Sequence, residues 1–137
     1  MKKLNVVIDT NILVSILKGS TYLAPIYFAF KEDKFKLVVN SEIIKELAAV
    51  LYRPHLKIAS NDIKELFRLI KLKALRVKIQ PLSISTCRDP KDNFILEIAQ
   101  AVKTCIIISN DKDLLSLSPF GNIPIITPEE FLDKIKE

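Results

Sequence analysis

Short apolar runs rich in β-branched residues alternate along the chain with longer segments in which apolar residues recur every three or four positions. The short runs predict strands of a sheet that is covered on both faces, and the longer segments predict amphipathic helices. One run alternates apolar and polar residues, which favours a position nearer the edge of the sheet. The expected strands cover residues 4–8, 35–39, 76–79 (the alternating run), 105–109 and 124–127.

Helices are expected in the intervals between the strands, and polar residues in front of them are expected to act as N-caps. The expected helices cover residues 10–17, 22–30, 41–52, 60–72, 90–102, 111–115 and 128–137. The expected caps are Ser41, Ser60 or Asn61, Asp89, and Asp111 or Asn110. Pro54 is expected to end the third helix, and Pro90 suits the first position of the fifth.

This order of elements predicts one α/β domain over residues 1–137. Alternating strands and helices imply parallel strands joined by right-handed crossovers, and the length suits a single core. In such a fold the ligand crevice lies outside the carboxyl ends of the strands. The residues that follow each strand are therefore the first candidates for chemistry.

Four acidic residues stand where a strand is followed by a helix, or on that helix: Asp9, Glu46, Asp92 and Asp111. At about 100° per residue, Glu46 and Asp92 fall at the borders of the apolar arcs of their helices, so both are expected to face the sheet edge. Like charges at about 4 Å repel by about 4 kcal/mol at an effective dielectric near 20, so a cluster of these acids needs a cation. Carboxylates without a nearby histidine predict a hard divalent ion.

Each acid taken singly also has a structural interpretation. Asp9 suits a turn at a strand end, and Asp111 suits a helix N-cap. Asp92 suits the first turn of a helix, where an acid complements the helix dipole, and Glu46 suits the border of any amphipathic helix. Only the four acids together favour a metal site.

The composition narrows the chemistry further. Two glycines among 137 residues exclude both glycine-rich phosphate loops, the Walker A motif and GxGxxG. The single histidine, His55, excludes the usual serine and cysteine triads and multi-histidine zinc sites, and it is expected in a loop or on the surface. A formal net charge of +5 favours a polyanionic partner. The candidates for contact with a phosphate chain are Arg53, Lys71, Lys73 and Arg76.

The cysteines and apolar segments point to the cytoplasm. Cys87 and Cys105 lie far apart in the sequence and are expected to stay reduced, with Cys105 in the core. The apolar run at residues 6–17 is interrupted by Asp9 and Asn11, so it is not expected to be a membrane span or a signal sequence.

Five motifs cover nearly the whole chain: VVIDTNILVS, SEIIKELAAVLYRP, DPKDNFILEIA, SNDKDLL and ITPEEFL. In this order and spacing they resemble a PIN domain, in the version found in toxins of toxin–antitoxin pairs related to VapC. The resemblance implies a three-layer α/β/α fold around a five-stranded parallel sheet in the order 3-2-1-4-5. It also implies metal-dependent cleavage of RNA by an endoribonuclease.

Carried over residue by residue, the resemblance assigns the four family acids to Asp9, Glu46, Asp92 and Asp111, and an additional acid to Asp113. Thr10 or Asn11 matches the polar position after the first acid. Ser109 and Asn110 stand where the family commonly has Thr-Gly. Because asparagine tolerates a left-handed backbone, the turn at Asn110 is expected to survive.

The resemblance also implies ligands and partners. Mg²⁺ or Mn²⁺ is expected to be held mainly by Asp9 and Asp92, with Asp111 and Glu46 as ligands or acting through water. An antitoxin protein and a homodimer suit the family. A groove between the helices at residues 12–30 and 41–52 suits an inhibitory peptide helix, although the same periodicity also fits core packing.

Phosphotransfer enzymes and receiver domains also use acids at strand ends. A phosphatase with a nucleophilic aspartate usually has a second acid two residues after the first, but position 11 is asparagine. A receiver domain wants a lysine at the end of its last strand, and the segment IITP has none. A non-catalytic RNA-binding or protein-interaction module on the same fold is the remaining alternative, because a fold does not fix an activity.

Overall fold

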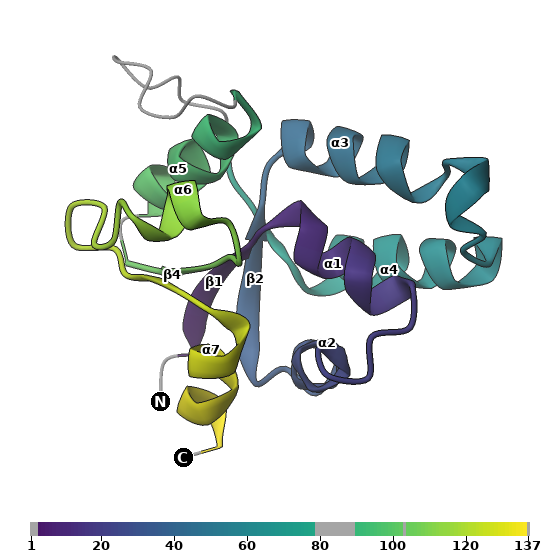
Figure 1. Cartoon of the computed structure of the whole chain (residues 1–137), viewed down its shortest axis with the longest axis horizontal. Coiled ribbons are helices and arrows are strands. Elements are labelled where there is room, and N and C mark those ends of the chain that lie inside the picture. The colour runs from purple at the N-terminus through teal and green to yellow at the C-terminus, as the bar shows by residue number, and fades with distance from the viewer. Residues whose placement is uncertain (1–2, 79–89, 103, 137) are drawn as a thin grey trace.

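Five parallel strands form the centre of the molecule (Figure 1). The computed structural model describes residues 3–78, 90–102 and 104–136, without the side chains of residues 90–93. The strands are β1 (Leu4–Ile8), β2 (Phe35–Val39), β3 (Leu75–Arg76), β4 (Ile106–Ile108) and β5 (Ile125–Ile126). Their order is β3-β2-β1-β4-β5, so the predicted order 3-2-1-4-5 is confirmed, with the alternating strand at an edge.

Helices cover both faces of this sheet, which makes the fold the predicted three-layer arrangement. Figure 1 shows α5 and α6 on one side of the strands, and α1, α2 and α4 on the other. The helices are α1 (Thr10–Leu17), α2 (Ala24–Lys31), α3 (Ser41–Leu51), α4 (Ser60–Lys73), α5 (Pro90–Val102), α6 (Lys112–Leu115) and α7 (Pro128–Ile135), with one 3-10 turn, η1 (Pro54–Leu56). Among the described residues, no helix is long and apolar enough to cross a membrane.

The alternation of side chains along the strands produces two separate apolar cores. Val6 and Ile8 of β1 point into a core shared with α1, α2, α4 and α7, where Phe35 and Phe131 meet edge-on at 5.3 Å between ring centroids. Val7, between them in sequence, points to the opposite core, shared with α5 and α6. A sheet buried on both faces explains why its strands read as continuous apolar runs.

Some boundaries differ from those predicted. The second helix begins at Ala24 rather than residue 22, because Pro25 then lies in the first turn, where its missing N–H costs nothing. The third strand begins one residue earlier and spans only Leu75–Arg76, while the predicted end at residue 79 lies outside the described residues. The fourth and fifth strands are shorter than predicted.

Two predicted N-caps were wrong. Asn40, rather than Ser41, caps α3, because its Oδ1 accepts the Ile43 N–H at 2.9 Å. The N-cap of α4 is Ala59, which offers no side-chain bond, so neither Ser60 nor Asn61 fills that role. Asp111 does cap α6 as predicted. Asp89 lies outside the described residues.

Candidate functional site

Asp9 is the residue directly after β1 and the N-cap of α1. Its backbone N–H donates to the carbonyl of Ile108, so the end of β1 is tied to the neighbouring strand β4. The residue is 6% exposed, and its Oδ1 accepts the backbone N–H of Asn11 at 3.2 Å. The carboxylate therefore sits at the positive end of a helix, which stabilises a negative charge.

Ser109 connects Asp9 to Asp111 across a hundred residues of sequence. Ile8 pairs with Ile108 in the parallel ladder, so the residues that follow them, Asp9 and Ser109, are neighbours at the carboxyl edge. The fully buried Ser109 hydroxyl donates to Asp9 Oδ2 at 2.8 Å and accepts the backbone N–H of Asp111 at 2.9 Å. Both oxygens of Asp9 are thus held in place by donors from different parts of the chain.

A pocket of about 360 Å³ opens in front of this pair of acids. Its described lining residues are Asp9, Asn11, Ile12, Ser15, Leu23, Asn110 and Asp111. Two carboxylates and two carboxamides thus face one cavity with apolar walls, a combination that suits a small polar ligand. Asp9, after β1, and Asp111, between β4 and α6, thus line one pocket at the switch point of the sheet, where ligands of open α/β sheets bind.

The other predicted acids occupy different positions. Glu46 is half-buried on α3, as its place at the border of the apolar arc predicts, but it is not among the described lining residues. Asp113 is exposed in α6, and its backbone N–H donates to Asp111 Oδ1 at 2.8 Å. Asp92 belongs to the first turn of α5, and its side chain lies outside the described part of the structure.

The polar residues next to the acids divide into two groups. Asn11 lines the pocket, whereas Thr10 is buried and its hydroxyl has no hydrogen-bond partner among the described residues. Ser109 is buried and donates its hydroxyl to the Asp9 carboxylate.

Asn110 does not have a positive φ, since among the described residues other than glycine only Asp33 and Lys57 do. Asn110 therefore does not use the left-handed backbone that asparagine tolerates, and the Ser109 hydroxyl accepts the Asp111 N–H across it.

The described residues of the pocket offer only oxygen donors to a divalent metal. Within residues 3–78, 94–102 and 104–136, no three His, Cys, Asp or Glu side chains form a group that could hold a metal. Asp9 and Asp111 alone supply two carboxylates, with amide oxygens of Asn11 and Asn110 nearby. Mg²⁺ keeps several waters and commonly takes only one or two protein carboxylates, so this oxygen-only set fits it.

Three pocket residues were not predicted from the sequence: Ile12, Ser15 and Leu23. Asn110 was named only as a candidate N-cap and at the position of the family's glycine, without a role in the site. Ser15 lies four positions after Asn11 on α1, and that spacing places both on one helix face, a signal the sequence does contain. Leu23 precedes α2 and reaches the pocket only through tertiary folding. Local sequence carries no sign of its position.

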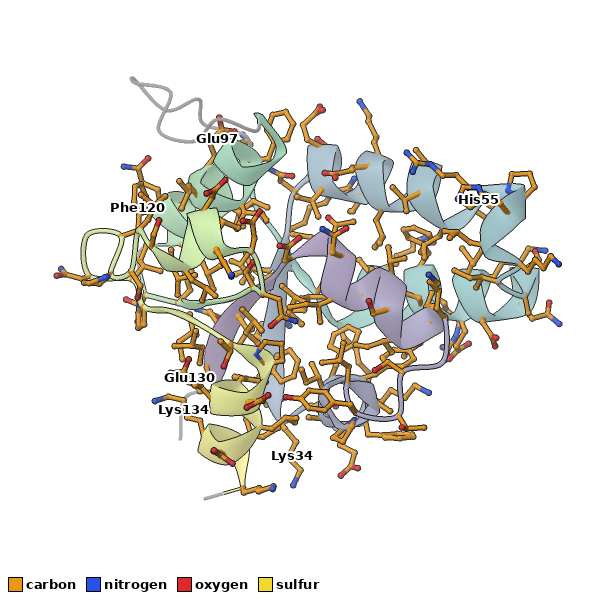
Figure 2. The ribbon with its side chains drawn as sticks, viewed as in Figure 1. Lys34, His55, Glu97, Phe120, Glu130 and Lys134 are labelled. Atoms are coloured by element: carbon orange, nitrogen blue, oxygen red, sulfur yellow. The ribbon has the colours of Figure 1, made fainter. Side chains whose placement is uncertain are left out.

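The basic residues predicted to contact a phosphate chain fall into two groups, one held by an ion pair and one exposed. Lys73 donates to the Lys31 carbonyl and pairs with Asp33 at 3.3 Å, so it ties α4 to the end of α2. Arg53, Lys71 and Arg76 are exposed. His55 is exposed on η1, at the end of the molecule away from α5 and α6 (Figure 2), which confirms its predicted surface position.

Comparison with known proteins identifies the family. A sequence model described as PIN domain matches residues 5–113. An uncharacterized protein of Methanocaldococcus jannaschii is 30% identical over 146 aligned residues, which cover 98% of this chain and 94% of that protein. A crystal structure of a Pyrobaculum aerophilum protein superposes with a TM-score of 0.67 over 97% of this chain and 90% of that one. At 15% identity, that superposition bears on the fold alone. The chain belongs to the PIN domain family.

Proposed function

We propose that this chain is a metal-dependent endoribonuclease that hydrolyses RNA phosphodiester bonds at the pocket between Asp9 and Asp111. PIN domains are generally nucleases, and a nuclease domain of this family implies RNA binding. The observation that carries the proposal is the convergence of Asp9 and Asp111 on one pocket, with Ser109 bonded to both.

Asp9 and Asp111 would hold Mg²⁺ or Mn²⁺, and Asp92 and Glu46 would complete the site directly or through water. The bound ion would polarise the phosphodiester and lower the pKa of a bound water. Asp113, in the first turn of α6, would add negative charge at the rim.

The remaining pocket residues act on the substrate in this proposal. The carboxamides of Asn11 and Asn110 can donate to phosphate oxygens, and the Ser15 hydroxyl can do the same. Ile12 and Leu23 form apolar walls that limit the access of bulk water. Glu46 would orient, or accept a proton from, the attacking water. The net charge of +5 supports a polyanionic substrate, because long-range attraction raises the rate of encounter.

A toxin role, with an antitoxin as inhibitor, is the finer part of this proposal. It is supported by the likeness of the motifs to those of VapC-type toxins. A toxin would act on RNA in the cytoplasm, and it would be a homodimer as suits the family. Induced expression of the wild-type chain should then arrest bacterial growth, and expression of the Asp9→Asn variant should not. Equal growth of both cultures would contradict the toxin role, but it would not bear on the proposed nuclease activity.

The proposed activity is tested by incubating the protein with a mixed pool of single-stranded RNA. Fragments should appear with Mg²⁺ or Mn²⁺ and disappear when a chelator is added. RNA that is bound but left intact would favour the alternative, a non-catalytic RNA-binding module. Cleavage that persists in excess chelator would contradict the metal dependence.

A further inference from the structure

A second cavity lies at the same edge of the sheet as the Asp9 pocket. It has a volume of about 230 Å³ and lies at the carboxyl ends of β2 and β3, between α3 and α4. Its described lining residues are Val39, Ile44, Phe67, Ile70, Lys71, Ala74 and Arg76, and we call it the β3 groove. None of these residues is among the described lining of the Asp9 pocket, and two of them, Lys71 and Arg76, are predicted contacts with a phosphate chain.

The floor and the rim of the β3 groove differ in chemistry. The floor is apolar and includes Phe67, a half-buried aromatic ring that packs only partly against the core. Lys71 and Arg76 form the rim, and both are exposed. Neither has an ion-pair partner in the part of the chain that the structure describes, and no acidic residue is among the described lining. The groove therefore presents an aromatic surface beside two cations whose charge is not neutralised.

The position of the β3 groove relates it to the acidic pocket. Arg76 ends β3 and Asp9 follows β1, with β2 between them in the sheet. Neighbouring strands lie about 4.8 Å apart, so two strand spacings amount to about 10 Å. Single-stranded RNA covers such a distance within a few nucleotides. Ile44, which lines the groove, lies on α3 together with Glu46.

We propose that the β3 groove binds one nucleotide of the RNA substrate, a few positions away from the phosphodiester that is cut. The base would stack against Phe67 and the aliphatic walls, and its phosphate would lie beside Lys71 and Arg76. Aromatic rings beside a positively charged track are the usual means of holding single-stranded nucleic acid. The volume is smaller than the range of about 300–1,000 Å³ typical of drug-sized ligands, which suits a single planar base. This inference rests on the proposed function and names a substrate subsite for it.

The test measures binding in a protein that cannot cut. A fluorescein-labelled, single-stranded RNA of mixed sequence is titrated with the Asp9→Asn protein, and anisotropy is followed at several salt concentrations. Phe67→Leu keeps the apolar volume but removes the ring, and should weaken binding about tenfold. Arg76→Gln and Lys71→Gln should each reduce the salt dependence by about 0.7 in log-log slope, the value for one phosphate contact on a single strand.

Matched controls lie on the opposite part of the molecule. Lys34 and Lys134 are exposed, and Figure 2 shows both near α7, away from α3. Lys34→Gln and Lys134→Gln remove the same charge as Lys71→Gln and should leave affinity within about twofold, as expected of residues that contact no phosphate. Urea denaturation of every variant establishes that each is folded at the temperature of the titration. Cross-linking with RNA that contains 4-thiouridine should mark the peptide that carries Phe67.

The possible results separate this inference from the proposed activity. If the wild-type protein cleaves RNA while the three groove variants bind like the controls, the β3 groove assignment is wrong and the nuclease stands. If the wild-type protein cleaves no RNA but the groove variants lose affinity, the assignment of the β3 groove is supported and the proposed nuclease activity is wrong. Uptake of an amphipathic peptide by the groove, with no competition from RNA, would overturn the assignment in favour of a protein partner.

Discussion

Ser109 Oγ donates a hydrogen bond to Asp9 Oδ2 at 2.8 Å, which joins two residues a hundred positions apart in the sequence. The same hydroxyl accepts the backbone N–H of Asp111, so one buried group orients the carboxylate after β1 and the backbone after β4. Hydrogen bonds to charged groups are stronger than neutral ones. Ser109 is therefore a positioning residue for both acids of the pocket.

Replacement of Ser109 tests this role. Ser109→Ala should destabilise the protein by about 1–3 kcal/mol, because it leaves a buried carboxylate oxygen and a backbone N–H without their partner. RNA cleavage should fall with it, since Asp9 is no longer held. Ser109→Thr keeps the hydroxyl and should recover most of the cleavage, whatever its extra methyl costs in packing.

Urea denaturation and single-turnover cleavage measure these two effects separately. The informative comparison is the cleavage rate without urea, at a temperature where wild type, Ser109→Ala and Ser109→Thr are all folded. A Ser109→Ala protein that cleaves as fast as wild type would show that the bond to Asp9 does not serve the reaction.

Removal of the Asp111 charge should weaken metal binding without unfolding α6. Asparagine is as good an N-cap as aspartate, so Asp111→Asn keeps the bond to the Asp113 N–H and changes only the charge. Isothermal titration with Mn²⁺ should show an affinity loss of at least about tenfold, as is typical when the surroundings of a bound metal are disturbed. The exposed Asp133 on α7 supplies the control, and Asp133→Asn should bind Mn²⁺ like wild type. Equal Mn²⁺ affinity for the Asp111 variant would remove Asp111 from the metal site.

The sequence was most informative where a pattern repeats over several residues. Continuous apolar runs identified a sheet covered on both faces, and strand–helix alternation identified parallel strands, so the placement of Asp9 and Asp111 at one edge of the sheet could be anticipated. That β1 and β4 are neighbours was implied only by the resemblance to PIN domains. Details decided by a single hydrogen bond could not be anticipated. Asparagine and serine are both favoured N-cap residues, so the sequence does not choose between Asn40 and Ser41. The structure shows that the Asn40 side-chain oxygen accepts the Ile43 N–H. Leu23 enters the pocket because of how α1 and α2 pack.

The cap of α3 gives a direct stability prediction. Asn40→Ala should cost about 1 kcal/mol, within the usual range for loss of an N-cap, and Asn40→Asp should cost less because it keeps the acceptor. Ser41→Ala should have a smaller effect than Asn40→Ala, since Ser41 is the first residue inside the helix. Urea midpoints of the three variants decide between the two caps. A larger loss for Ser41→Ala would contradict the assignment of Asn40.

The thiol of Cys105 should be unreactive in the folded protein. Burial raises its pKa from 9.0 to about 11 because the charged form is desolvated, and its Sγ donates to the Ala99 carbonyl. At pH 8 only about one thiol in a thousand would then be the reactive thiolate. In a Cys87→Ser background, iodoacetamide should label Cys105 slowly in buffer and quickly in urea, as followed by mass spectrometry. Rapid labelling of the native protein would show that this thiol is accessible and ionised.

The central claim is that the carboxylate of Asp9 is required for cleavage of RNA, and one paired measurement tests it most directly. Single-turnover cleavage of the same RNA with Mg²⁺ is compared between wild type and Asp9→Asn. This variant keeps the size and the oxygen that accepts the Asn11 N–H, replaces the second oxygen with an NH₂ group that can donate to the Ser109 hydroxyl, and removes the charge. The rate should fall at least about a hundredfold, a loss typical of removing one charge-stabilising group from an active site, while the urea midpoint stays close to that of wild type. Equal rates for the two folded proteins would falsify the assignment of this pocket as the active site.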